Sequence, residues 1–298
     1  MAIGNGPVNT LFAEILRLFL IITVLLSIAA PARPVYTRKM SQNHRKSKPG
    51  QKHSRGRPNK SEGPLFLFGL HTIEAALRNP DRHKHKLFAT PNAIRRLSER
   101  DIAIAVPIEE CQPRTIAQMV PRDSVHQGAV LKVDPLPPYG SKELEGAHLI
   151  LALDQVTDPH NVGAIMRSAV AMDADAIVTT SRHSPEETGV LAKSASGALD
   201  MLKHVQVPNM ARFVAEMGDQ GFQRIALDSE ADDALEDISI GDRVVLVLGS
   251  EGKGVRQGVR AACDSLARLD MPGKIKSLNV SNAAIVCLYA IRQRMKPL

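Results

Sequence analysis

Short, almost continuous apolar runs recur through the C-terminal half of the chain and alternate with segments of helical periodicity. The runs predict strands at residues 149–153, 176–179, 205–207, 224–227, 244–248 and 266–269. The segments between and after them predict helices at residues 162–172, 185–199, 210–217, 255–263 and 281–294. Strands that are apolar on both sides must be covered on both faces, which is typical of parallel sheets. The sequence therefore predicts an α/β domain with a parallel sheet over residues 148–298.

Ligands bind parallel sheets at the carboxyl ends of the strands. The loops that follow the predicted strands are therefore the first candidates for a site, and they begin after residues 153, 179, 227, 248 and 269.

A smaller block with the same kind of alternation covers residues 64–134. Its pattern predicts strands at residues 65–69, 86–89, 102–106 and 130–133, and helices at residues 71–78, 92–100 and 111–120. This order predicts a small α/β sandwich. Asp134–Gly140 reads DPLPPYG, a proline-rich break that predicts a linker over residues 135–147 between two domains.

The net charge of +7 is the balance of two unlike parts of the chain. Residues 1–60 hold eleven Lys and Arg and one acid, whereas residues 61–298 hold 27 Lys and Arg and 30 Asp and Glu. Residues 33–60 carry ten basic residues and no acid, so they cannot bury enough apolar surface to fold alone. We expect residues 1–63 to hold an apolar run followed by a disordered basic tail. That tail is either a solvated segment or an arm that contacts RNA phosphates.

The apolar run Leu18–Ala30 has 13 residues, while a bilayer-spanning helix needs about 20. Its length suits the core of a signal peptide or a weak anchor. A third interpretation is that translation starts at Met40, which opens a typical soluble N-terminus. A membrane location is therefore not expected.

The three cysteines lie far apart, at positions 111, 263 and 287, and form no CxxC pair. This spacing predicts neither a zinc site nor a disulfide framework, and we expect no metal and a reducing compartment. The chain has three Tyr, seven Phe and no Trp, which argues against an aromatic platform that stacks single-stranded nucleic acid.

Three loops of the C-terminal block carry unusual polar patterns. Gly249–Gly254 (GSEGKG) follows a buried strand but matches neither a Walker A motif nor a dinucleotide fingerprint, so it is a glycine-rich turn that carries Glu251. Asn161–Arg167 opens a helix, with Asp158 or Asn161 as its cap, and Lys276–Asn282 precedes the last one. Each has a structural interpretation: a tight turn, a solvated arginine, or a helix cap at Ser281.

Together these loops resemble a known family. NVGAIMR (161–167), LVLGSEGKGV (246–255) and MPGKIKSLNVSNA (271–283) are similar, in order and spacing, to the SpoU/TrmH superfamily of RNA ribose 2′-O-methyltransferases. FGLHTIEAALRNP (68–80) and VHQGAVLKV (125–133) resemble the N-terminal RNA-binding domain of the RlmB-type 23S rRNA guanosine 2′-O-methyltransferases.

The resemblance implies a SPOUT-type domain with a deep trefoil knot, a ribosomal-protein-like RNA-binding domain, a homodimer, S-adenosylmethionine as cofactor and RNA as substrate in the cytoplasm. It carries cofactor binding over to Gly249, Leu269 and Leu278. It carries catalysis over to the polar residues Asn161, Arg167, Glu251, Ser277 and Asn279. The chain departs from the family pattern at Asp270, which could bring a charge near the cofactor, and at Asn282, where we expect an effect on helix packing.

For the mechanism, an arginine pKa above about 12 makes Arg167 a costly base. We expect Arg167 to grip a phosphate and polarise the ribose hydroxyl, while Ser277, Asn279 and Asn161 fix geometry. Glu251 is expected to orient Arg167 or its neighbours. The resemblance gives His160 no role.

Two alternatives remain open at this stage. One is a tRNA 2′-O-methyltransferase of the same superfamily, which the extra first domain disfavours by analogy. The other is a catalytically silent RNA-binding factor in ribosome assembly, which would not need the full set of polar residues. An exported or membrane protein, a further interpretation, rests on the apolar run alone.

Overall fold

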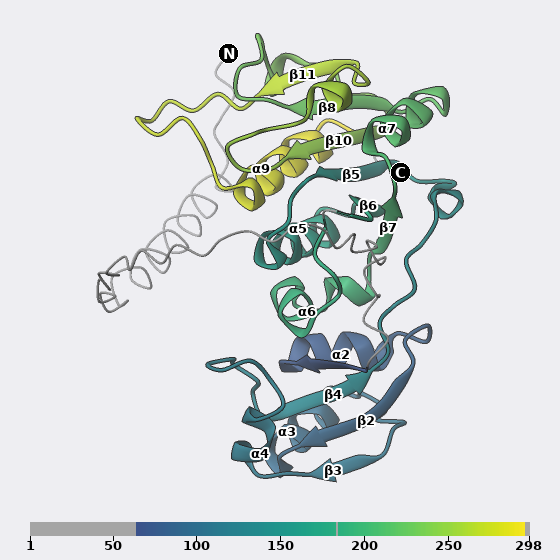
Figure 1. The fold of residues 1–298 in the computed structure, drawn as a ribbon, viewed down its shortest axis with the longest axis vertical. Coiled ribbons are helices and arrows are strands. Elements are labelled where there is room, and N and C mark those ends of the chain that lie inside the picture. Colours follow the sequence, from purple (N-terminus) through teal and green to yellow (C-terminus); the bar gives the residue numbers. More distant parts are fainter. Residues whose placement is uncertain (1–63, 183, 296–298) are drawn as a thin grey trace, which may run out of the picture. The chain divides into compact units, whose positions relative to one another are not determined.

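A computed structural model describes residues 64–182 and 184–295, which form two sheets with their helices (Figure 1). The predicted apolar run, the alternative start and the basic tail lie outside the described residues. Within the described residues, no helix is both long and apolar enough to cross a bilayer.

The N-terminal sheet has the strand order β1-β4-β2-β3. Its strands are β1 (Leu65–Phe68), β2 (Lys84–Ala89), β3 (Ile108–Glu110) and β4 (Ala129–Val133). β4 pairs antiparallel with both β1 and β2, and β3 pairs parallel with β2. The helices are α2 (Leu70–Arg78), α3 (Pro91–Ser98) and α4 (Pro113–Ala117). The predicted α/β sandwich is thus present.

Two predictions in this part were wrong. Residues 102–106 form no strand, because the chain reaches the β2 edge only at Pro107, whose carbonyl accepts from Leu87 N at 2.9 Å. Pairing continues from there into β3. The predicted helix at residues 111–120 shrinks to α4, because a residue before proline disfavours helical backbone and Pro113 sits at the first turn.

The C-terminal sheet is entirely parallel in the described residues, with the strand order β7-β6-β5-β10-β8-β11-β9. Its strands are β5 (Leu149–Asp154), β6 (Ala176–Thr180), β7 (Lys203–Val207), β8 (Gln223–Leu227), β9 (Asp233–Ala234), β10 (Val244–Gly249) and β11 (Ser265–Arg268). The prediction of a parallel sheet is confirmed. The two-residue β9 carried no periodicity and was missed.

Helices cover both faces of this sheet, as the apolar strands require. Leu149, Leu151 and Leu153 of β5 belong to the core under α5 (Pro159–Ala171), α6 (Gly189–Ala195) and α9 (Val280–Arg292). The alternate residues Ile150 and Ala152 belong to the core under α7 (Met210–Asp219) and α8 (Gln257–Arg260). The described residues also form three short 3₁₀ helices: η1 (Ser141–Leu144), η2 (Ala198–Asp200) and η3 (Leu235–Asp237).

The helix predicted at residues 185–199 is shorter in the structure. Thr188 caps it by accepting from Leu191 N at 3.2 Å, so α6 begins at Gly189. Ser196 and Gly197 adopt positive φ angles of 51° and 99° and end it before η2. The helix predicted at residues 255–263 is likewise reduced to α8.

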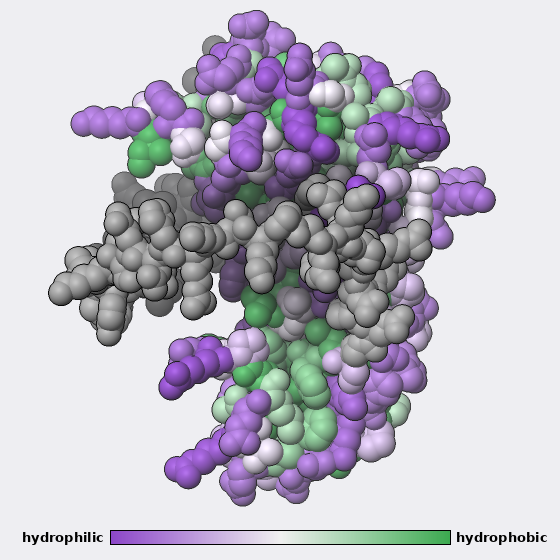
Figure 2. Space-filling view, viewed as in Figure 1, coloured by the Kyte–Doolittle hydropathy of each residue, from purple (hydrophilic) through white to green (hydrophobic). Residues whose placement is uncertain are grey.

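β1 of the first sheet packs on α6, helix α2 packs on α6 and η2, and one buried core includes residues of both parts. The backbone approach is close: a Cβ at Gly189 would lie 2.4 Å from Phe66 O. The predicted linker also has fixed contacts, because Tyr139 N donates to His204 O at 3.1 Å beside β7. On the face that Figure 2 shows, hydrophilic side chains cover much of the C-terminal part, and apolar side chains gather on part of the N-terminal α/β sandwich.

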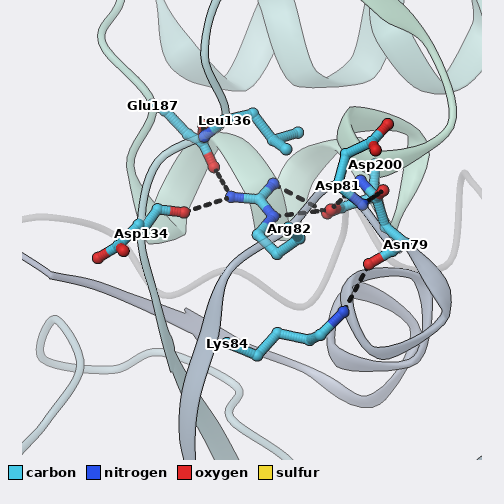
Figure 3. Close-up of polar contacts among 8 residues, drawn as sticks. All are labelled: Asn79, Asp81, Arg82, Lys84, Asp134, Leu136, Glu187 and Asp200. Atoms are coloured by element: carbon cyan, nitrogen blue, oxygen red, sulfur yellow. Dashed lines mark hydrogen bonds and ion pairs between the residues drawn. The ribbon is translucent and has the colours of Figure 1, made fainter.

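A fully buried arginine joins the two parts (Figure 3). Arg82, between α2 and β2, has no exposed side-chain surface, and neither has Asp200 of η2. Arg82 Nε donates to Asp200 Oδ1 at 2.8 Å and Nη2 to Asp200 Oδ2 at 3.1 Å. Its Nη1 donates to Glu187 and, at 3.2 Å, to the carbonyl of Asp134.

Glu187 completes this junction by accepting from Leu136 N at 2.8 Å, which holds the start of the linker. Burial raises the pKa of Glu187, while Arg82 opposes that rise. Hydrogen bonds to Asp200 raise the pKa of Arg82 against the desolvation that lowers it. We call Arg82, Glu187 and Asp200 the junction triad.

Candidate active site

The glycine-rich loop closes on itself directly after β10. Gly254 N donates to Ser250 O at 2.9 Å, which draws the two ends of the loop together. A Cβ added at Gly249 would lie 2.0 Å from the carbonyl carbon of Gly254, so no other residue fits there without moving the loop. Gly252 and Gly254 have φ angles of 78° and 64°, which glycine adopts without strain. The loop is thus a tight backbone turn, as predicted.

An ion pair between a buried aspartate and a half-exposed arginine anchors the end of this loop. Asp154, the last residue of β5, is fully buried and accepts from Arg256 N and Nε at 2.9 Å and from Nη2 at 2.6 Å. The hydrogen bonds to Asp154 raise the pKa of Arg256. The pair therefore fixes where the chain leaves the loop and enters α8. Neither residue was predicted from the sequence, although an acid at the end of an apolar strand is an available signal.

A cavity of about 270 Å³ opens at the carboxyl ends of β8, β10 and β11. Its walls include Gly249, Leu269 and Leu278, the three residues expected to bind the cofactor. Glu251 and Ser277 also line it. The remaining lining residues are Leu227, Ser229, Leu248, Ser250, Gly252, Gly254, Met271, Lys276, Val280 and Ala283. Three of the five loops singled out from the sequence thus meet here.

Three of the expected polar residues form one hydrogen-bonded cluster beside the cavity. Glu251 Oε1 accepts from Asn279 Nδ2 at 2.6 Å and from Asn161 Nδ2 at 3.2 Å. Asn279 Nδ2 also donates to Asn161 Oδ1 at 3.1 Å. Glu251 Oε2 has no hydrogen-bond partner within the described part of the chain. The cluster therefore presents one free carboxylate oxygen.

Asn279 has a second role as the N-cap of α9. Its Oδ1 accepts from Ser281 N at 2.8 Å and from Ser281 Oγ at 2.6 Å. The expected cap at Ser281 was therefore wrong, because Ser281 donates to the cap rather than forming it. At α5, Asp158 is the cap and accepts from His160 N at 3.0 Å. Asn161 thus lies in the first turn of α5 and is held toward Glu251.

Arg167 makes no hydrogen bond to this cluster. It lies on the exposed side of α5, and its guanidinium has no hydrogen-bond or ion-pair partner among residues 64–182 and 184–295. Glu251 was expected to orient Arg167 or its neighbours; its Oε1 bonds to Asn161, on the helix that carries Arg167, and not to the guanidinium. The guanidinium is free to bind an anion.

Neither of the two departures from the family pattern lies in the cavity wall. Asp270 is exposed, pairs with Arg268 Nε at 2.8 Å and is not part of the cavity wall. Asn282 is exposed on α9, so the expected effect on helix packing is not found. His160 Nδ1 lies 3.1 Å from Ser194 Oγ, outside the polar cluster.

Comparison with known proteins gives two family matches. Residues 148–289 match the SpoU rRNA methylase family, and residues 66–139 match the substrate-binding domain of RNA 2′-O-ribose methyltransferases. The chain is 35% identical over 243 residues to the 23S rRNA (guanosine-2′-O-)-methyltransferase RlmB of Pseudomonas aeruginosa, covering 78% of this chain and 97% of that protein. The RlmB protein of a Burkholderia species is 35% identical over 245 residues, covering 78% and 98%.

A solved structure has the same fold. The SpoU methyltransferase AviRb of Streptomyces viridochromogenes, determined in complex with its cofactor AdoMet, superposes with a TM-score of 0.66 at 23% identity, covering 78% of this chain and 91% of AviRb. The parallel sheet, its loop cavity and the preceding substrate-binding domain define an RNA 2′-O-ribose methyltransferase. The chain belongs to the SpoU rRNA methylase family.

The cavity suits the cofactor of such an enzyme. Leucine side chains offer apolar walls for an adenine ring, while the glycine-rich loop leaves backbone groups open to its polar edges. Asp270 faces Arg268 rather than the cavity, so its carboxylate is already paired. The residues present therefore fit S-adenosylmethionine.

Proposed function

We propose that this chain methylates the 2′-hydroxyl of a guanosine ribose in 23S rRNA, with S-adenosylmethionine as the methyl donor. The observation that carries the proposal is the Asn161–Glu251–Asn279 cluster at the mouth of a glycine-lined cavity. The RlmB relatives, which match over nearly their whole length, support the guanosine of 23S rRNA as the target.

The cofactor would lie against Gly249, Leu269 and Leu278, and it supplies a methyl group bound to an electrophilic sulfonium. Arg167 is the free cation for a neighbouring RNA phosphate, and a guanidinium fork matches that anion. From there it would polarise the 2′-hydroxyl, whose oxygen would take the methyl group as the bond from sulfur to methyl breaks and whose proton would pass to solvent. Ser277, in the cavity wall, fixes the ribose.

The Asn161–Glu251–Asn279 cluster holds this geometry before RNA arrives. Glu251 Oε1 and the α9 cap fix Asn279, and Asn279 in turn fixes Asn161. Glu251 Oε2 is left to accept a hydrogen bond from a bound group. Groups that are held in position before the substrate binds lower the free-energy barrier of the reaction by several kcal/mol. No metal ion takes part in this proposed step.

We further infer a homodimer. Val286 and Tyr289, three residues apart on α9, are 45% and 50% exposed, and α9 packs against the helix that carries Arg167. A second copy over this face would cover both apolar side chains. We also propose that the parallel-sheet domain contains a trefoil knot and that the protein is located in the cytoplasm. The proposed domain limits are 64–134 and 148–298, with a linker at 135–147.

The chemistry is tested by incubating rRNA with labelled cofactor and then hydrolysing it with alkali. Because alkaline cleavage needs a free 2′-hydroxyl, label in a resistant dinucleotide identifies 2′-O-methylation. Arg167→Ala is expected to reduce transfer by about 10²–10³-fold while cofactor binding persists. Undiminished transfer by Arg167→Ala would remove it from the mechanism, and label released as mononucleotides would refute 2′-O chemistry.

A further inference from the structure

Two histidines and an aspartate gather on the N-terminal sheet, away from the cavity. His83 Nδ1 lies 2.5 Å from Asp134 Oδ2, and His85 Nε2 lies 2.7 Å from Asp134 Oδ1. The two imidazole rings meet edge to face with centroids 4.5 Å apart. One ligand atom from each residue lies within 4.8 Å of the other two. We call His83, His85 and Asp134 the His–Asp cluster.

The strand pairing creates this cluster. Asp134 N donates to His83 O at 3.0 Å, so Asp134 lies directly opposite His83 at the end of β4. The register between β2 and β4 shifts between Lys84 and Lys86, which leaves His85 at an irregularity of the strand. Such bulges redirect a side chain, and here both imidazoles reach the same carboxylate.

The neighbouring lysines do not occupy the cluster. Lys84 Nζ donates to Asn79 O at 2.5 Å, and Lys86 Nζ pairs with Glu109 Oε2 at 2.5 Å. The cluster thus combines one carboxylate with two imidazoles. It remains open to solvent, since the side chains of His83, His85 and Asp134 are 70%, 34% and 45% exposed.

We propose that the His–Asp cluster binds one divalent transition-metal cation such as Zn²⁺. Its ligands would be His83 Nδ1, His85 Nε2 and a carboxylate oxygen of Asp134, with water completing the coordination. Two nitrogens and one oxygen suit Zn²⁺, whereas Mg²⁺ and Ca²⁺ prefer oxygen ligands. With bonds of about 2.0–2.1 Å, tetrahedral ligand atoms lie about 3.4 Å apart. Reaching that spacing needs side-chain shifts of roughly 1 Å. When the cation binds, each imidazole keeps its proton on the opposite ring nitrogen.

This site would act on the junction between the two parts of the chain. The carbonyl of Asp134 accepts from Arg82 of the junction triad, and its side chain would hold the cation. A bound cation would therefore tie β2 to Asp134, the last residue before the linker, whose carbonyl Arg82 already holds. The earlier expectation of no metal rested on cysteine spacing, which does not bear on a His–Asp cluster assembled by strand pairing.

The test uses the full chain after a chelator has removed bound metal. It is titrated with ZnCl₂ in a calorimeter, and a parallel titration with MgCl₂ serves as the comparison. We expect one Zn²⁺ site per chain whose affinity falls at least about tenfold in His85→Ala and in Asp134→Asn, because each loses a ligand. His71→Ala, which removes an exposed histidine elsewhere in the same unit, is the matched control and should bind like the original chain. Zn²⁺ should also raise the unfolding temperature of the original chain and the control, but not of the two variants.

Folding of the variants is checked by their unfolding temperature in chelator, and His85→Gln provides a milder replacement. Equal Zn²⁺ affinity in the original chain, His85→Ala and Asp134→Asn would overturn the proposal, since the ion would then bind elsewhere, for example at histidines of the N-terminal tail. Binding of Zn²⁺ no tighter than Mg²⁺ would overturn it as well.

Discussion

Replacing Arg82 by methionine should destabilise the protein far more than the loss of a surface arginine. Arg82 and Asp200 have no exposed side-chain surface and Glu187 is 13% exposed, so the substitution leaves two buried carboxylates without their cation. Breaking a buried ion pair from one side costs about 3–5 kcal/mol. Methionine keeps much of the volume, so this cost reflects charge rather than a cavity.

The assay is unfolding by denaturant, monitored by circular dichroism. Arg82→Met should lower the free energy of unfolding by about 3–5 kcal/mol. Adding Glu187→Gln and Asp200→Asn should recover at least half, because uncharged groups need no buried cation. Arg95→Met is the control: Arg95 is exposed and pairs loosely with Glu99 at 3.8 Å, so its loss should cost about 0.5 kcal/mol or less. A cost below about 1 kcal/mol for Arg82→Met would refute the reasoning.

Three further predictions concern the loop, a buried histidine and the tail. Gly249→Ala should abolish cofactor binding in calorimetry, since its Cβ would lie 2.0 Å from Gly254, whereas Gly258→Ala, with open space around it, should bind normally. Burial lowers the pKa of His204 from 6.5 to about 4, so the unfolded chain binds a proton there first as the pH falls. The free energy of unfolding should therefore fall by up to about 3 kcal/mol as the pH is lowered from 6.5 to 4. His204→Gln should make this dependence on pH less steep, and equal steepness in the two proteins would contradict the prediction. Deleting residues 1–60 removes eleven basic residues and should weaken RNA binding and flatten its dependence on salt; an unchanged slope would exclude a phosphate-contacting arm.

The parallel sheet could be predicted because its strands are apolar on both sides, a pattern that only a doubly covered sheet accommodates. Runs such as Val244–Leu248 carry that signal in their own residues. The same reasoning failed at residues 102–106, where an apolar run packs against the core without pairing. Periodicity reports burial, whereas strand formation also needs a partner edge, and Pro107 delays that pairing.

The sequence indicated residues that gather around the cavity but not how they contact one another. The three loop motifs pointed to Glu251 and Asn279, yet the bond between them joins residues 28 positions apart and depends on how two loops fold. The junction triad could not be predicted from the sequence for the same reason, since Arg82 and Asp200 are 118 positions apart. A lone arginine in a sequence gives no sign that it will be buried, because its partners come from another part of the chain.

Methyl transfer to unmodified 23S rRNA, 16S rRNA and tRNA, tested side by side with labelled S-adenosylmethionine, examines the central claim most directly. The account predicts label on 23S rRNA alone, mapped to the ribose 2′-oxygen of a single guanosine. Label on tRNA would contradict the assigned substrate while keeping the chemistry. No label on any of the three RNAs, with cofactor binding intact, would contradict the claim that the chain methylates free 23S rRNA.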